Sequence, residues 1–172
     1  MAIINIEFKA RIADIGLLEK KLLEKDPEFI GEDHQVDTYF NVSVGRLKLR
    51  EGNIENALIW YDRQNTSGAK QSDVLLYQHL PDKSLKEILI KLHGIKVVVD
   101  KKRKIYFIEN VKFHFDKVTK LGHFVEVEAI DKNGDIGIQK LREQCAFYAS
   151  LFNIRDSDYV AVSYSDMMLE KE

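Results

Sequence analysis

Apolar and polar residues alternate along the start of the chain, with the two-residue period of a β-strand that has two unlike faces. The apolar positions of this segment, residues 4–12, are Ile4, Ile6, Phe8, Ala10 and Ile12. The positions between them are Asn5, Glu7, Lys9 and Arg11. A carboxylate and two cations therefore share one face of the predicted strand, a pattern that on its own is typical of the solvated face of an antiparallel sheet.

Three further segments alternate in the same way, and each sorts its charged residues onto one face. The polar faces hold the cations of residues 46–50, then Lys112 with His114 and Asp116, and finally Glu126 with Glu128. A solvated face more often mixes hydroxyl, amide and isolated charged residues. The sorting therefore favours an inward-facing polar cavity for a ligand that is both multiply charged and bound to metal.

Periodicity and turn residues predict the remaining elements. Strands are expected at residues 4–12, 35–41, 46–50, 57–63, 73–79, 95–99, 105–109, 111–118 and 124–130. Helices are expected at residues 14–25, 82–93 and 135–152, with Asp14 as an N-cap and Gly94 as a C-cap. Residues 65–70 form a polar loop that we expect to be mobile, and residues 159–168 are ambiguous.

The basic run Lys101-Lys102-Arg103-Lys104 lies between two of these predicted strands. A solvated hairpin is the structure expected for its lysines, and Arg103 is the one member considered for a site. His114 is open to two interpretations, a residue of the cavity or a hydrogen-bonded structural histidine.

About eight strands with three helices inserted among them make an antiparallel α+β layout. If the helices cover the apolar strand faces from outside, the charged faces point inward, and closing the sheet into a barrel removes its edges. Like charges about 4 Å apart at an effective dielectric constant near 20 repel by roughly 4 kcal/mol. Such a lumen therefore needs counter-charges, which a polyanion with a divalent metal supplies.

The 172 residues are enough for one domain, residues 1–172, with a buried core. Charged residues make up 31% of the chain, yet the net charge is only −2, which argues against a general nucleic-acid binder. No apolar run approaches the length of a membrane span, and the N-terminus lacks the pattern of a secretion signal, so a cytoplasmic protein is expected. Cys145 is the only cysteine and is expected in the core.

Segments along almost the whole chain resemble one known family. They are Asn5-Ile6-Glu7-Phe8-Lys9, Asp37-Thr38-Tyr39-Phe40, Gly45-Arg46-Leu47-Lys48-Leu49-Arg50-Glu51, Leu58-Ile59-Trp60-Tyr61-Asp62-Arg63, His114-Phe115-Asp116, Leu121-Gly122-His123-Phe124-Val125-Glu126-Val127-Glu128 and Ser163-Tyr164-Ser165-Asp166. Their order and spacing are similar to those of the CYTH superfamily, the triphosphate tunnel metalloenzymes, whose N-terminal signature is Glu-x-Glu-x-Lys. The likeness is closest to the bacterial branch of class IV adenylyl cyclases. It implies a closed antiparallel eight-stranded tunnel.

The resemblance also implies the residues of a site. The metal ligands, for Mg²⁺ or Mn²⁺, would be Glu7, Asp116, Glu126 and Glu128. The phosphate-binding residues would be Lys9, Arg11, Lys48, Arg50, Arg63 and Arg103, where arginine offers bidentate contacts. Direct catalytic roles would fall to Glu7, Lys9 and Arg50.

Three positions depart from the family pattern. Asn5 replaces the first glutamate of the signature, which puts a second metal ion in doubt. Ser163-Tyr164-Ser165 stands where hydrolases of the family often have a lysine. Asp62 stands where many relatives have a lysine, so the phosphate-binding role passes to Arg63.

Two classes of function follow from the resemblance. The first is a metal-dependent enzyme that acts on a triphosphate, either a cyclase that converts ATP to cyclic AMP and pyrophosphate or a hydrolase of thiamine triphosphate or inorganic triphosphate. The branch likeness and the missing lysine favour the cyclase. The second is a non-catalytic module that binds a nucleotide or polyphosphate. The plainest alternative to both is a structural domain whose charged strand faces are simply solvated. The expected partner is a small-molecule triphosphate, and no binding of nucleic acid or of a membrane is expected. The sequence leaves open whether the chain forms a homodimer.

Overall fold

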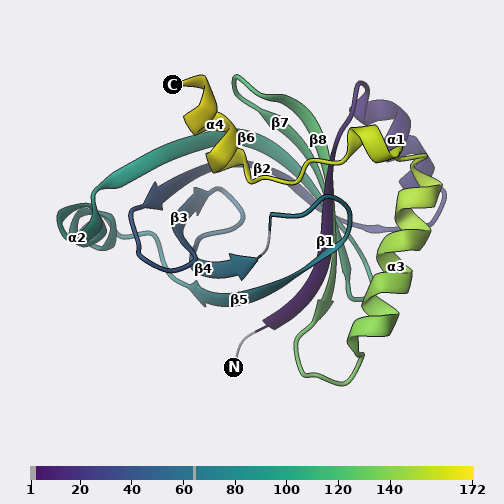
Figure 1. Cartoon of the computed structure of the whole chain (residues 1–172), viewed down its shortest axis with the longest axis horizontal. Helices are drawn as coiled ribbons and strands as arrows, with labels where there is room; N and C mark the ends of the chain where they lie inside the picture. Colours follow the sequence, from purple (N-terminus) through teal and green to yellow (C-terminus); the bar gives the residue numbers. More distant parts are fainter. Residues whose placement is uncertain (1–2, 64) are drawn as a thin grey trace.

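The computed structural model describes residues 3–63 and 65–172, and its strands close into one antiparallel barrel (Figure 1). In sequence order the strands are β1 (Ile3–Arg11), β2 (Glu28–Phe40), β3 (Arg46–Gly52), β4 (Ala57–Arg63), β5 (Lys70–Gln78), β6 (Ile95–Ile108), β7 (Val111–Val118) and β8 (Gly122–Asp131). Around the barrel they follow the order β1-β5-β4-β3-β2-β6-β7-β8. Within the described residues, this arrangement confirms the predicted α+β fold with a closed eight-stranded barrel.

The strand boundaries correct the sequence prediction at three places, the smallest of which is β5, since this strand begins at Lys70, inside the predicted loop of residues 65–70. β6 runs unbroken through residues 95–108, so the basic run belongs to a strand and not to a solvated hairpin. Arg103, for example, pairs with Asp33 of β2 on one side and with Asp116 of β7 on the other. β2 begins at Glu28, well before the predicted start, because a bulge at residues 29–31 keeps the chain paired with the end of β6.

Helices pack on the outside of the barrel, and their ends follow the cap residues. They are α1 (Ile15–Leu23), α2 (Lys83–His93), α3 (Ile138–Leu151) and α4 (Tyr164–Lys171), with a 3₁₀ turn at Asp156–Asp158. The Asp14 carboxylate accepts a hydrogen bond from the Leu17 amide at 3.3 Å, and Gly94 ends α2 at a φ of 69°. Both predicted caps are confirmed. The fourth helix, α4, lies in the stretch that the sequence left ambiguous.

α1 and α3 lie against the same side of the barrel (Figure 1), and a core of apolar side chains packs between these two helices and the barrel wall. Phe8 of β1 and Phe113 of β7 pack here against Leu22 of α1 and Cys145 of α3. The Cys145 thiol donates a hydrogen bond to the Ile6 carbonyl at 3.1 Å, which confirms its expected place in the core. Because the apolar strand faces are covered from outside, the charged faces point into the barrel.

The C-terminal segment covers one end of the barrel, where it crosses the opening in front of the strands (Figure 1). Tyr164, Met167 and Met168 of α4 pack there in a second apolar cluster with Val118 and Phe124. These two barrel residues stand at the end of β7 and the beginning of β8, so the cluster marks one end of the tunnel. No helix in the described part of the chain combines the length and the apolar composition that crossing a membrane requires.

Candidate active site

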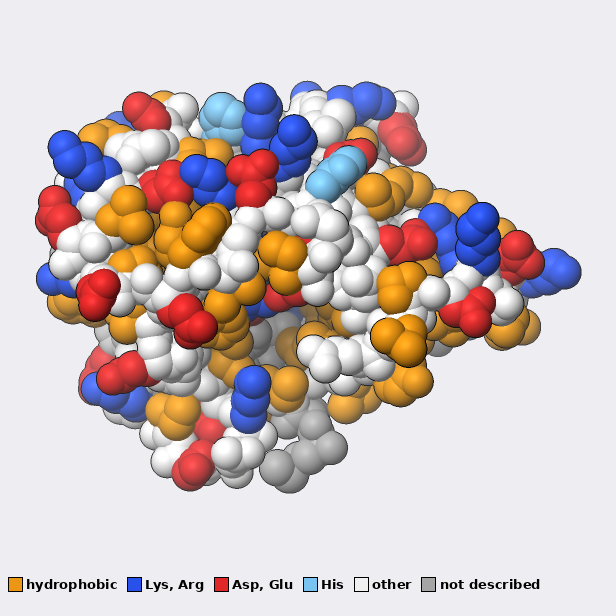
Figure 2. Space-filling view, turned by 180° about the vertical axis from the view of Figure 1, so that it is seen from behind, with side chains coloured by type: hydrophobic (Ala, Val, Ile, Leu, Met, Phe, Trp, Pro, Cys, Tyr) orange, Lys and Arg blue, Asp and Glu red, His pale blue; other side chains and the backbone are white. Residues whose placement is uncertain are grey.

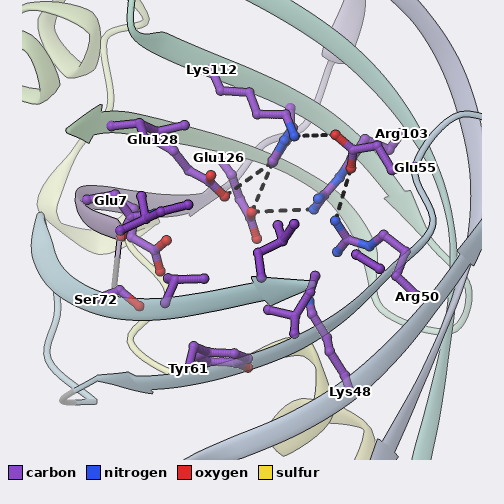
Figure 3. A pocket seen from close by; sticks show the side chains of 18 of the residues that line it. Glu7, Lys48, Arg50, Glu55, Tyr61, Ser72, Arg103, Lys112, Glu126 and Glu128 are labelled. Carbon is purple, nitrogen blue, oxygen red and sulfur yellow. Dashed lines mark hydrogen bonds and ion pairs between the residues drawn. The ribbon is translucent and has the colours of Figure 1, made fainter. Parts of the chain in front are cut away.

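The barrel encloses a cavity of about 800 Å³ that receives inward-facing side chains from all eight strands (Figure 3). Cationic residues outnumber carboxylates in its lining. The cations are Lys9, Lys48, Arg50, Arg63, Lys101, Arg103, Lys112 and Lys132, and the carboxylates are Glu7, Glu55, Glu126 and Glu128. The charges that the alternating strands placed on one face therefore do meet around one enclosed space.

Three of these cations are held by a single buried carboxylate, Asp37 of β2. Its Oδ2 accepts hydrogen bonds from Lys48 at 3.0 Å, from Arg50 at 2.9 Å and from Lys101 at 2.8 Å. Its Oδ1 accepts a second bond from Arg50 at 2.9 Å, so the guanidinium contact is bidentate. We refer to Asp37, Lys48, Arg50 and Lys101 as the cationic cluster.

Burial and charge act against each other in this cluster. Burial alone would raise the pKa of Asp37, but Arg50, Lys101 and Lys48 outweigh it and hold that pKa well below its usual range. Burial lowers the pKa of Lys101 to about 7, with Arg50 acting in the same direction and Asp37 opposing it. The carboxylate is therefore ionised near pH 7, while Lys101 is close to its titration point.

A second carboxylate, Asp116, is bonded just as fully. Arg103 donates to its two oxygens at 2.7 and 2.6 Å, and the Tyr164 hydroxyl donates at 2.7 Å. Arg103 also reaches Glu126 at 3.3 Å, and Lys9 lies 3.0 Å from the other oxygen of Glu126. Through Arg103, these contacts connect Asp116 of β7 to Glu126 of β8.

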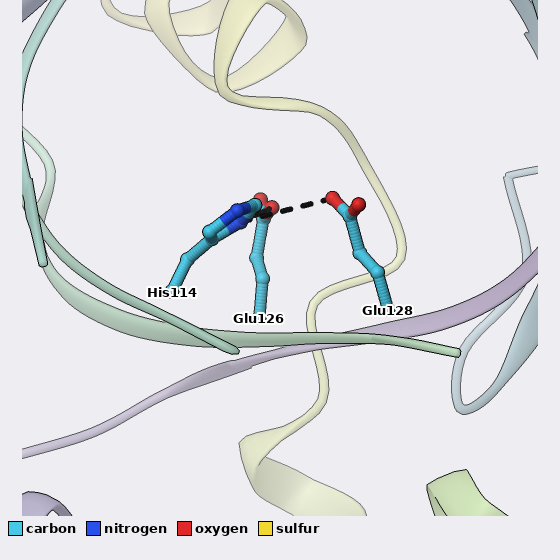
Figure 4. Close-up of side chains that lie close together, drawn as sticks. All are labelled: His114, Glu126 and Glu128. Carbon is cyan, nitrogen blue, oxygen red and sulfur yellow. Dashed lines mark hydrogen bonds and ion pairs between the residues drawn. The ribbon is translucent and has the colours of Figure 1, made fainter. Parts of the chain in front are cut away.

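His114 of β7 lies beside Glu126 and Glu128 of β8, and all three side chains point into the barrel (Figure 4). Each offers a ligand atom within 4.8 Å of the others, an arrangement that could hold a metal ion. His114 Nδ1 is 3.2 Å from Glu126 and 3.7 Å from Glu128. We refer to these three residues as the acidic cluster.

Burial and neighbouring charges shift the pKa values of all three residues of the acidic cluster. Burial, reinforced by Arg103, lowers the pKa of His114 to about 3, so the imidazole is neutral near pH 7. Burial raises the pKa of Glu128 to about 7, with Glu7 and Glu126 acting in the same direction. Burial would also raise the pKa of Glu126, but Lys9 and Arg103 keep it well below its usual range.

The donor set of the acidic cluster fits a divalent cation. Two carboxylates and a neutral imidazole are ligands that Mn²⁺ accepts, and the carboxylates alone suit Mg²⁺. His114 Nε2 and Asn5 Oδ1 are both buried and lack a hydrogen-bond partner among the described residues. Glu7 pairs with Glu128 across β1 and β8, although its carboxylate forms an ion pair with Arg63. A bound cation would therefore complete contacts that the protein leaves unmade.

Most of the residues that the resemblance assigned to a site line this one cavity. They are Glu7, Lys9, Lys48, Arg50, Arg63, Arg103, Glu126 and Glu128. Arg11 lies outside it, at the exposed end of β1, where it donates to the Leu121 carbonyl at 2.7 Å. Asp116 lies behind the lining, with its oxygens bonded to Arg103 and Tyr164. The roles of all these residues stay predictions.

Sequence reasoning missed several residues of the cavity. Lys101 is 1% exposed and not part of a solvated run, because β6 turns every second residue of that run inward. Asp37 belongs to one of the segments that resemble the family, but neither the pattern nor the resemblance predicts a role for it. The two-residue period of a strand could have identified both residues, because it places Asp37 on the same strand face as Tyr39, and Lys101 on the same face as Arg103. Glu55 bridges Lys112 and Arg50 from the loop before β4, where no periodicity could have identified it.

A closed antiparallel barrel whose lumen carries both a cationic cluster and an acidic cluster is a tunnel with a charged lining. The family model of the CYTH domain matches residues 4–164, and the chain belongs to this family. No curated protein sequence matches the chain.

Three solved structures illustrate the likeness of the fold. The PH1012 protein of Pyrococcus horikoshii OT3 is 22% identical, with 94% of this chain and 98% of that chain covered and a TM-score of 0.78. A candidate adenylate cyclase of Vibrio parahaemolyticus is 17% identical, with 96% and 97% covered and a TM-score of 0.78. HpAC1 of Hippeastrum, a candidate adenylyl cyclase with a dominant triphosphatase activity, is 14% identical, with 97% and 95% covered and a TM-score of 0.59. At these identities the likeness concerns the fold alone.

Proposed function

We propose that the chain is a metal-dependent enzyme that acts on a triphosphate. The observation that supports this most strongly is that one cavity is lined by the three cations of the cationic cluster, Lys48, Arg50 and Lys101, and by the whole acidic cluster. The lining carries more cations than carboxylates, which favours a polyanion. The acidic cluster, in turn, offers ligands that such an anion cannot use.

In this proposal the cationic residues bind the phosphates, and the carboxylates and His114 bind the metal. Lys48, Arg50 and Arg103 would bind phosphate oxygens and stabilise the negative charge that develops on a leaving phosphate. Glu126 and Glu128, with His114, would hold Mg²⁺ or Mn²⁺. The metal, when bound, supplies Lewis-acid polarisation of a phosphoryl oxygen. Asp37 keeps Lys48 and Arg50 in place before any ligand arrives, which reduces the cost of ordering these side chains on binding.

We propose cyclisation of ATP as the reaction. The ribose 3′-hydroxyl would attack the α-phosphorus, and pyrophosphate would leave toward the cationic cluster. The resemblance to the class IV adenylyl cyclase branch supports this reaction. The absence of a lysine from Ser163-Tyr164-Ser165, the segment where hydrolases of the family often have one, supports it too.

Hydrolysis is the second candidate. Water would attack a terminal phosphorus of thiamine triphosphate or inorganic triphosphate, with the same cations binding the phosphates. The triphosphatase activity printed for the Hippeastrum relative favours it. Asn5, which brings no charge to the start of the signature, keeps a binding module without turnover as the remaining alternative.

Product analysis tests these proposals. The purified protein is incubated with Mn²⁺ or Mg²⁺ and, separately, with ATP, thiamine triphosphate and inorganic triphosphate. Cyclic AMP with pyrophosphate identifies the cyclase, and orthophosphate from any of the three identifies the hydrolase. Glu128→Gln should abolish turnover, whereas Glu143→Gln, on the exposed face of α3, should leave it unchanged. Absence of turnover together with absence of a metal-dependent thermal shift would contradict the proposal.

A further inference from the structure

Tyr164 is the first residue of α4, in the C-terminal segment that crosses one end of the barrel. Its side chain is buried and lines the cavity together with the neighbouring Ser163. The Ser163 hydroxyl accepts a hydrogen bond from the Asp166 amide at 3.1 Å and so caps the helix. The capped first turn of α4 therefore places the tyrosine at the wall of the cavity.

The tyrosine side chain makes two polar contacts with the charged groups around it. Its hydroxyl donates a hydrogen bond to Asp116 Oδ2 at 2.7 Å, and the centre of its ring lies 3.7 Å from Lys9 Nζ. A ring face attracts a cation, and the attraction is stronger where water is excluded. Burial, reinforced by Asp116 and Glu126, raises the pKa of Tyr164 well above its usual range, so the hydroxyl keeps its proton and stays a donor.

Both contacts lead to cations that bind Glu126. Lys9 Nζ lies 3.0 Å from one oxygen of Glu126. Arg103 lies 3.3 Å from the other oxygen, and the Asp116 carboxylate holds this guanidinium by a bidentate contact at 2.7 and 2.6 Å. Tyr164 therefore contacts one of these two cations directly and the other through Asp116.

These two cations differ from those on the outer surface. On the face seen in Figure 2, lysine and arginine side chains extend into solvent, where they move freely. Lys9 and Arg103 are only 5% and 3% exposed, so their directions are set by protein groups. Packing of the Tyr164 ring against Phe124, at a centroid distance of 5.0 Å, accounts for an aromatic side chain here. It does not account for the hydroxyl, whose burial is costly without a hydrogen bond.

We propose that Tyr164 is a positioning residue of the site, whose ring holds Lys9 and whose hydroxyl holds Arg103 by way of the carboxylate between them. Both cations line the cavity, so the tyrosine keeps them directed at the place where a phosphate binds. The proposal rests on the function proposed above, because it requires that these cations bind phosphate. It makes the C-terminal segment a part of the site and not only a cover over its end.

Two substitutions of Tyr164 separate the hydroxyl from the ring. Tyr164→Phe keeps the ring over Lys9 and removes the bond to Asp116. Tyr164→Leu removes both contacts and leaves an apolar side chain beside Phe124. Inorganic triphosphate is titrated into each variant by calorimetry in the presence of Mn²⁺. We expect about tenfold weaker binding in Tyr164→Phe, the lower end of the loss typical of residues that hold the ligands of a metal, and a larger loss in Tyr164→Leu.

A second buried tyrosine provides the matched control. Tyr148 of α3 packs edge-on against Phe113 in the apolar core outside the barrel, at a centroid distance of 4.6 Å. Tyr148→Phe makes the same chemical change at a distance from the cavity and should leave triphosphate affinity unchanged. Urea denaturation of the same samples shows whether either substitution has lowered the stability of the fold.

A measurement without ligand distinguishes positioning from a general structural role. Arg103 Nε donates to Asp116 Oδ1 at 2.7 Å, so its proton should exchange slowly with water. In an NMR exchange experiment this proton should exchange several-fold faster in Tyr164→Phe than in the wild type. Tyr148→Phe should retain the slow exchange.

The outcomes separate this proposal from the one on which it rests. Wild-type triphosphate affinity in both Tyr164 variants would overturn the positioning role and leave the proposed function standing. Equal losses of affinity in Tyr164→Phe and Tyr148→Phe would also overturn it, as would weaker binding in Tyr164→Phe with unchanged exchange at Arg103. Failure of the wild type itself to bind triphosphate would overturn both proposals.

Discussion

The cationic cluster and the acidic cluster both contain carboxylates, but they differ in how far these carboxylates are paired with cations. Both stand on inward faces of barrel strands, the first around the buried carboxylate of Asp37 and the second around the partly buried carboxylates of Glu126 and Glu128. Asp37 receives three cations at 2.8–3.0 Å. Glu128, in contrast, has no lysine or arginine nitrogen within 4.0 Å in the part of the chain that the structure describes, and its nearest partner is the neutral His114.

The difference shows how one cavity can prepare for two ligands of opposite charge. In the cationic cluster the protein supplies its own counter-ion, so the cations are held in position and still carry a surplus of positive charge. In the acidic cluster Glu126 has its own cations, Lys9 and Arg103, but Glu128 lies beside Glu7 and Glu126 without one, so an added metal ion is favoured there. The first cluster should therefore matter for stability, and the second mainly for ligand binding.

The largest expected effect is on stability, at the centre of the cationic cluster. Asp37→Asn leaves three buried cations without their carboxylate, and breaking a buried ion pair in this way costs about 3–5 kcal/mol. Urea denaturation measures this loss. Asp100→Asn, which breaks the exposed pair with His34, is the control and should cost far less. A similar small loss in both variants would remove the distinction between the clusters.

The next effect concerns the acidic cluster and should appear in metal binding. Glu128→Gln removes one of two carboxylates and should weaken Mn²⁺ binding about 100-fold, since even partners one shell further out typically contribute 10–100-fold. The free energy of unfolding without metal should not fall, because the change relieves repulsion with Glu7 and Glu126. Titration calorimetry and urea denaturation of the same samples check both expectations. Unchanged Mn²⁺ affinity would exclude Glu128 as a ligand.

A smaller effect, on triphosphate affinity, should distinguish Lys48 from Arg11, although the resemblance predicted that both bind phosphate. Lys48→Gln should weaken binding of inorganic triphosphate about tenfold, because a hydrogen bond to a charged group contributes about 1.5–3 kcal/mol. Arg11→Gln should have no effect, since Arg11 lies outside the cavity lining and bonds the Leu121 carbonyl. Equal losses in the two variants would place the phosphate-binding surface outside the cavity.

The last effect is a dependence of stability on pH that belongs to Lys101. Its pKa in the folded protein is about 7, below the value of about 10.4 in an unfolded chain, so between these two the unfolded chain binds the extra proton. Stability therefore rises with pH in this window, by at most about 1.4 kcal/mol per pH unit, and is lost as the pH falls through 7. Denaturation at pH 7, 8 and 9 should show this rise in the wild type and a weaker one in Lys101→Met. Parallel curves would contradict the assignment.

The two clusters were predictable from the sequence to different degrees. Glu126 and Glu128 stood out because strict alternation places both on one face of one strand, and β8 fulfils it. Lys101 did not, because a run of four cations is usual in a turn, and only the pairing of β6 with both β2 and β7 shows that the strand continues through it. Local periodicity cannot reveal a strand that its neighbours enforce.

Contacts between residues of different elements could not be predicted from the sequence for another reason. Asp37 meets Lys101 from the neighbouring strand β6, and Tyr164 meets Asp116 from a helix distant in the chain. Register and closure decide these contacts, and neither is encoded in the spacing of one segment. Asp116 is an example, because the sequence does not reveal that its oxygens are bonded to Arg103 and Tyr164.

The coupling between metal and triphosphate tests the central claim most directly. Inorganic triphosphate is titrated into the protein by calorimetry, once with EDTA and once with Mn²⁺, with a correction for the metal–triphosphate complex that forms in solution. One joined site predicts binding at least about tenfold tighter with Mn²⁺, a coupling of about 1.4 kcal/mol, and linkage requires that the triphosphate tighten Mn²⁺ binding by the same factor. Equal affinities with and without Mn²⁺ would show that the two clusters do not form one site.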